Sequence, residues 1–67
     1  MFIIFNQLSS GQEIAIDVAN IKEFHPEEID GLSGTLIHFY RGEVPWIVSQ
    51  DVFKVAELCN KAKTGKL

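Results

Sequence analysis

The chain has 67 residues, of which 46% are hydrophobic and 22% are charged. That length allows one domain, spanning residues 1–67, and the hydrophobic share is typical of a folded rather than a disordered chain. Nine acidic and six basic residues give a net charge of −3, which disfavours nucleic acid as a partner because phosphates usually meet a basic face. Cys59 is the single cysteine, so no internal disulfide can form, and a cytoplasmic location is expected.

The first part of the chain predicts three strands. The apolar run at about 2–7 suits a strand with Phe2 and Ile4 on one face. This run is too short for a signal peptide or a spanning helix, so we expect no membrane insertion. Strict alternation over about 12–18 predicts a second strand that forms a hairpin with the first. A short third strand is expected at about 21–25.

The segment 26–34 is predicted to be an exposed loop, because it combines a proline, two glycines and several acidic residues. Its acidic cluster either receives a basic partner or only keeps the loop soluble. The cluster consists of Glu23, Glu27, Glu28 and Asp30.

Two further strands are predicted at about 35–40 and 44–48, flanking a turn at 40–43. The expected register pairs Phe39 with Val44, Ile37 with Trp46, and Thr35 with Val48, which gives one apolar strip. The opposite face carries Leu36, His38, Pro45 and Ile47. Because Pro45 has no N–H to donate, its strand must lie at a sheet edge or contain a bulge.

A C-terminal helix is predicted at about 50–63. Ser49 is a favourable N-cap, Asp51 complements the helix dipole, and Gly65 suits the end of the helix. The apolar residues with helical spacing are Val52, Val55, Ala56, Cys59 and Ala62. The sequence therefore predicts an α+β fold: a small antiparallel sheet of four to five strands in two hairpins, with one helix packed on it.

The sequence predicts no catalytic, metal or cofactor site. Cys59 falls on the expected core face of the helix, where a thiol behaves as a small hydrophobe. His25 and His38 lie in different elements, and two histidines with one cysteine do not provide the spacing of a metal site. We therefore expect no cofactor and no enzymatic activity.

More apolar surface is expected than one short helix can bury. Such a surplus usually marks a surface for a protein partner, and a homo-oligomer is its simplest outcome. The alternative is that the sheet curls and buries the surplus internally. The candidate interaction residues are Phe2, Ile4, Leu36, His38, Ile47, Phe53 and Leu58.

The order of these features resembles small bacterial flagellar and swarming-motility proteins of the FlbD/SwrD type. The resemblance covers most of the chain, and its motifs are short. They are the opening strand, Leu8 with Gly11, the run Glu13-Ile14-Ala15-Ile16, Ile21 with Phe24, a hairpin turning at Gly42, and the helix after Ser49. It implies a motility role, and a more distant likeness to β-rich LytTR-type domains implies transcriptional regulation.

Three hypotheses for function follow. The leading one is a non-enzymatic interaction module that binds and regulates a larger protein or complex. The second is a DNA-binding regulator of the LytTR-like type. The third is a phage or mobile-element accessory protein that inhibits a host factor.

Overall fold

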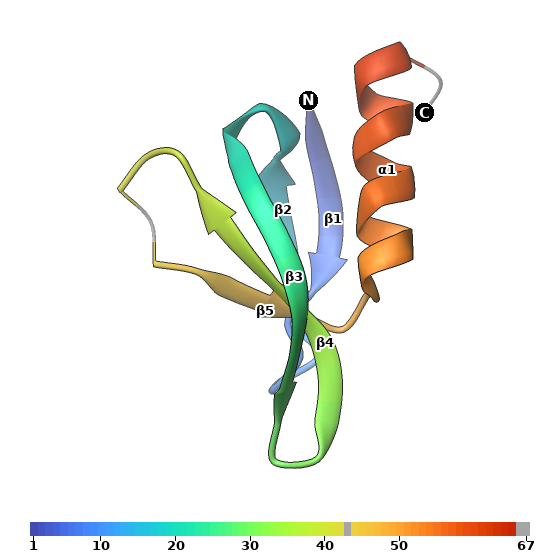
Figure 1. The fold of residues 1–67 in the computed structure, drawn as a ribbon. Coiled ribbons are helices and arrows are strands. Elements are labelled where there is room, and N and C mark those ends of the chain that lie inside the picture. The colour runs from blue at the N-terminus through green and yellow to red at the C-terminus, as the bar shows by residue number, and fades with distance from the viewer. Residues whose placement is uncertain (43, 66–67) are drawn as a thin grey trace.

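The computed structural model describes residues 1–42 and 44–65 and confirms the predicted α+β class (Figure 1). Its elements are the strands β1 (Phe2–Asn6) and β2 (Glu13–Asp17), a 3-10 turn (Val18–Asn20), the strands β3 (Ile21–Ile29), β4 (Leu32–Phe39) and β5 (Trp46–Val48), and the helix α1 (Val52–Thr64). Every predicted strand is present, with bounds that differ at one or both ends.

The five strands form two antiparallel sheets, which corrects the predicted single sheet. One contains β1 and β2, and the other has the order β3-β4-β5. The two sheets meet where β1 ends, at an isolated bridge between Gln7 and Val48. Two backbone bonds flank it: Leu8 N donates to Ile47 O over 2.9 Å, and Ser49 N donates to Asn6 O over 2.8 Å. Because the contact is one bridge long, the sheets can turn relative to each other and enclose a core.

The predicted loop at 26–34 is wrong, because β3 continues to Ile29 and forms a hairpin with β4. The turn is Asp30-Gly31, and both residues have positive φ, at 51° and 79°. That backbone matches the right-handed twist of paired strands and is the reason for the preference for Asp-Gly in two-residue hairpins. Pro26 pairs with Thr35 inside this ladder. A proline is tolerated there because β3 is an edge strand.

The predicted register of the C-terminal hairpin is confirmed in its paired part. Thr35 lies opposite Val48, and Ile37 lies opposite Trp46. The predicted Phe39–Val44 pair is absent from the ladder, since β5 is shorter than expected and begins after Pro45. Of the predicted turn at 40–43, Glu43 lies outside the described residues. β5 forms the second edge of its sheet, as the proline requires.

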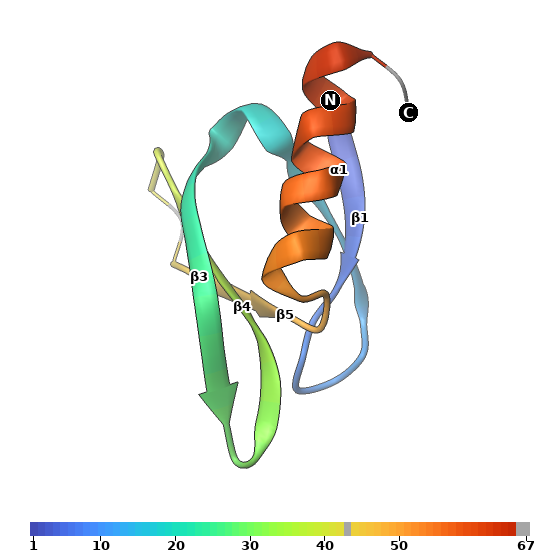
Figure 2. The same ribbon diagram turned by 45° about the vertical axis from the view of Figure 1, so that its right-hand side comes forward.

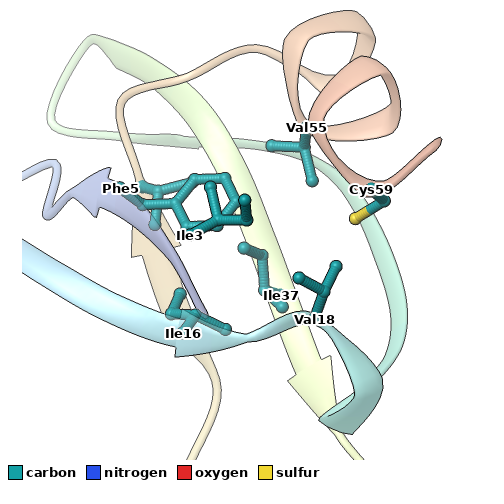
Figure 3. Close-up of a cluster of buried hydrophobic side chains, with 8 residues drawn as sticks. Ile3, Phe5, Ile16, Val18, Ile37, Val55 and Cys59 are labelled. Atoms are coloured by element: carbon teal, nitrogen blue, oxygen red, sulfur yellow. The ribbon is translucent and has the colours of Figure 1, made fainter. Parts of the chain in front are cut away.

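The core lies between the two sheets and the helix. Phe5, Ile37, Val48 and Val55 are fully buried, and Figure 3 shows side chains of this cluster converging from β1, β2, β4 and α1. The buried apolar cluster is Ile3, Phe5, Ile16, Val18, Ile37, Val48, Val55 and Cys59. The helix contacts β3 and β4, and Figure 2 shows it running beside the sheets. Cys59 is buried, as the helical spacing predicts.

The helix starts at Val52, two residues later than predicted. Asp51, not Ser49, is the N-cap, and its carboxylate accepts a 2.7 Å hydrogen bond from the backbone N–H of Lys54. Ser49 lies before the helix at the junction of the sheets, where its backbone N–H donates to the carbonyl oxygen of Asn6. Gly65 ends the helix with φ of 71°, as predicted. No helix within residues 1–42 and 44–65 is long and apolar enough to cross a membrane.

Candidate interaction surface

The outer face of the sheet β3-β4-β5 gathers three of the predicted interaction residues. Ile37 points into the core, and side chains alternate along a strand, so its neighbours Leu36 and His38 point outward. Ile47 pairs with Leu36 and shares that face. All three side chains are half-buried.

Two further apolar residues, missed by the sequence analysis, extend this face. Ile29 and Leu32 flank the turn of the β3–β4 hairpin and are 44% and 52% exposed. The composition of 26–34 predicts a loop for them, and an apolar residue in a loop has no defined face. The Asp30-Gly31 pair was the signal that could have found them, because it indicates a hairpin with both residues in paired strands.

A hollow of about 360 Å³ opens beside these residues. Its volume is in the range of sites that accept small ligands or a partner's side chain. It is lined by Gln7, Leu8, Ser9, Ile29, Asp30, Leu32, Pro45, Trp46 and Ile47. The lining therefore comes from the sheet β3-β4-β5 and from the segment that follows β1, and it exists only where the two meet. We use the name outer-face patch for Leu8, Ile29, Leu32, Leu36 and Ile47.

The other candidate apolar residues lie elsewhere. Phe2 and Ile4 are 67% and 54% exposed on the outer face of β1 and β2, where Phe2 has Asp17 as its cross-strand neighbour. Phe53 is 86% exposed on α1, whereas Leu58 packs against the core. The predicted surplus is thus exposed at three separate places, and Leu58 does not contribute to it.

The four residues of the acidic cluster do not form one docking loop. Alternation along β3 places Glu23 and Glu27 on the outer face and Glu28 on the opposite one, while Asp30 lies in the turn. Charges on an edge strand discourage pairing with another chain. Their position therefore has a structural explanation: they protect the exposed edge of β3.

The two histidines meet across the β3–β4 hairpin, which the sequence analysis did not anticipate. His25 Nε2 and His38 Nε2 are 3.3 Å apart, and the rings stack with centroids 5.4 Å apart. His25 Nδ1 lies 3.1 Å from the carbonyl oxygen of Pro26. The strand register creates this contact, because His25 is diagonal to His38 on one face.

Cys59 does not contact the two histidines. It lies in the core, and burial raises the pKa of its thiol, which keeps the thiol protonated and unreactive at neutral pH. The histidines lie on the outer face of the sheet, so the structure does not bring a thiol and an imidazole together. Among the described residues, no group of three or more histidine, cysteine, aspartate or glutamate side chains could hold a metal ion.

No protein-family model, curated protein or solved structure matched the chain.

Proposed function

We propose that the chain is a small, non-enzymatic interaction module that self-associates and regulates a larger protein or complex by binding it. The single observation that supports this is the outer-face patch, where Ile29 and Leu32 each expose about half of their side chains beside a hollow. Exposed apolar patches beside concave surfaces are typical of protein interfaces.

Shape and composition favour this patch over the other two apolar places. Four of its five apolar side chains line one hollow, and the fifth, Leu36, pairs with Ile47 beside it. The β1 face offers Phe2 and Ile4 beside the charge of Asp17, and the helix offers Phe53 alone, with Asp51 and Lys54 as neighbours in the chain. An interface derives most of its affinity from a few clustered residues that lose water together.

A second copy is the occupant that we assign to the outer-face patch. Twofold pairing needs only one self-complementary patch, and homodimers are the commonest oligomers. Pairing through the edge of β3 is disfavoured, because Lys22, Glu23 and Glu28 line that strand and Pro26 interrupts its N–H donors. Face-to-face packing of the outer sheet remains, and it buries the apolar residues that the monomer exposes.

The solution mass tests this proposal, measured by light scattering after size exclusion over a wide concentration range. We expect the native chain to form a dimer and Leu32→Glu to form a monomer, because the new charge lies on an exposed member of the outer-face patch that the dimer would bury. Ile4→Glu and Phe53→Glu are matched controls that place the same charge on the other two apolar places and should keep the native mass. A native chain that is monomeric throughout, or a Leu32→Glu variant that still dimerises, contradicts the assignment.

The remaining hypotheses stay predictions. The resemblance to FlbD/SwrD-type proteins stays a prediction for the regulated process, and the cytoplasmic location stays one as well. DNA binding is not favoured by any feature of the described surface, since the exposed strand β3 is rich in carboxylates. A gel shift with mixed genomic fragments at moderate salt tests it directly.

A further inference from the structure

His25 and His38 share a hydrogen bond between their Nε2 atoms, and the separation of these two nitrogens also matches that of two ligands on one metal ion. A tetrahedral ion held by two imidazole nitrogens at about 2.0–2.1 Å keeps those nitrogens about 3.3 Å apart. The two Nε2 atoms are 3.3 Å apart. A square-planar ion would need the nitrogens about 2.9 Å apart at similar bond lengths, so the spacing favours a tetrahedral ion such as zinc.

The second ring nitrogen of His25 supports the same reading. A carbonyl oxygen can only accept a hydrogen bond, so His25 Nδ1 carries the proton that points to Pro26 O, 3.1 Å away. The Nε2 of a neutral His25 ring is then unprotonated, and its lone pair accepts the hydrogen bond from His38 Nε2–H, 3.3 Å away, in the metal-free chain. A metal ion bound by both Nε2 atoms would replace that shared proton. Metal-ligating histidines in proteins are held in this way, with the other ring nitrogen donating to a carbonyl or carboxylate.

The surroundings of the histidine pair also favour the binding of a cation. His25 is exposed and His38 is half-buried, so an ion can reach both from solvent. Glu23 lies opposite His38 on the outer face, and Glu27 is two residues from His25 on the same face. Their negative charges attract a cation without joining the pair as a three-ligand cluster.

We propose that His25 and His38 form a two-histidine site that binds a zinc ion through both Nε2 atoms on the outer face of the β3–β4 hairpin. Water fills the remaining two positions of the ion, which leaves the site open to an external ligand. The proposal concerns one chain and does not rest on self-association. The alternative is a hydrogen-bonded and stacked pair of histidines that only stabilises the hairpin.

A titration of the full chain with zinc chloride tests the site, followed by the imidazole ¹⁵N resonances. The chain has two histidines, so both rings are assigned by single substitutions. We expect saturable one-to-one binding that shifts both Nε2 resonances, with His25 in the Nδ1–H form before zinc is added. Nε2 resonances that do not move with zinc would overturn the proposal, and the titration itself is made on the native chain.

His25→Gln and His38→Gln should each weaken zinc binding roughly ten-fold or more, since even the loss of an outer-shell partner costs that much. Circular dichroism checks that both variants fold. Cys59→Ala removes the other side chain that zinc prefers, and Leu32→Glu separates the site from self-association; both should bind zinc like the native chain. Unchanged affinity in the glutamine variants, or lost affinity in either control, contradicts a single-chain histidine site.

Discussion

At the scale of single residues, polar groups in the interior are paired and the one free thiol is inert. Thr35 is fully buried, and its hydroxyl donates to the carbonyl oxygen of Gln50 over 2.7 Å. Gln50 in turn exchanges hydrogen bonds with the backbone N–H and side chain of Asn6. No buried side-chain nitrogen or oxygen of the described residues lacks a partner. These bonds fix the chain where β1, β4 and the helix start approach one another.

Cys59 makes stability depend on pH in the alkaline range. Burial raises its pKa above the ordinary 9.0, so the unfolded chain loses the thiol proton at a lower pH than the folded chain does. The contribution of the neutral thiol is complete below about pH 9 and is lost as the pH rises through the folded pKa. We expect the free energy of unfolding to fall more steeply above pH 9 in the native chain than in Cys59→Ala, measured by urea titration. Parallel pH profiles would contradict this.

At the scale of elements, the start of the helix has two candidate N-caps, Ser49 and Asp51, and the structure uses Asp51. Asp51 accepts a hydrogen bond from Lys54 N, while the hydroxyl of Ser49 has no such role. We expect Asp51→Ala to lower the free energy of unfolding by about 1 kcal/mol through loss of the cap. Ser49→Ala is the matched control and should change it by less than about 0.5 kcal/mol. Chemical denaturation measures the free energy of unfolding of both variants. A larger loss of stability in Ser49→Ala than in Asp51→Ala would mean that Ser49 is the N-cap.

The β3–β4 hairpin extends through residues whose composition predicts a loop. The composition of 26–34 resembles a loop, because a proline and carboxylates are unfavourable in most strands. An edge strand reverses that argument, since charges and proline protect it from pairing with other chains. Whether a strand lies at an edge is a property of the sheet and cannot be read from the strand itself.

At the scale of the whole molecule, Gly34 is placed where the two sheets meet. A side chain there would collide with the backbone oxygen of Val48 and would lie 3.2 Å from Cδ2 of Leu8. We expect Gly34→Ala to lower the free energy of unfolding by about 1–3 kcal/mol, the usual cost of overpacking. Gly31→Ala gives the comparison, because an added Cβ there meets open space and suffers only from the positive φ, so a loss of about 1 kcal/mol is expected. Thermal or urea unfolding measures the loss of stability in both variants. A smaller loss in Gly34→Ala than in Gly31→Ala would contradict close packing at the junction of the sheets.

The sequence by itself determined the presence of every strand and of the helix, and the inward face of β2, β4, β5 and α1. Alternation identified Ile16 and Ile37 as core residues, and helical spacing identified Val55 and Cys59, because burial follows the periodicity of the local backbone. The register of Thr35 with Val48 could also be predicted, since shifting it by one residue would turn the apolar strip to solvent.

Only the tertiary structure decided how the outward faces combine. Leu8 and Leu32 line one hollow because a single bridge between Gln7 and Val48 joins the sheets, and no local pattern encodes that junction. His25 and His38 meet because of the strand register set by the Asp30-Gly31 turn. Local periodicity specifies which side of an element is buried, whereas the neighbours of an exposed side chain depend on contacts between residues far apart in the chain.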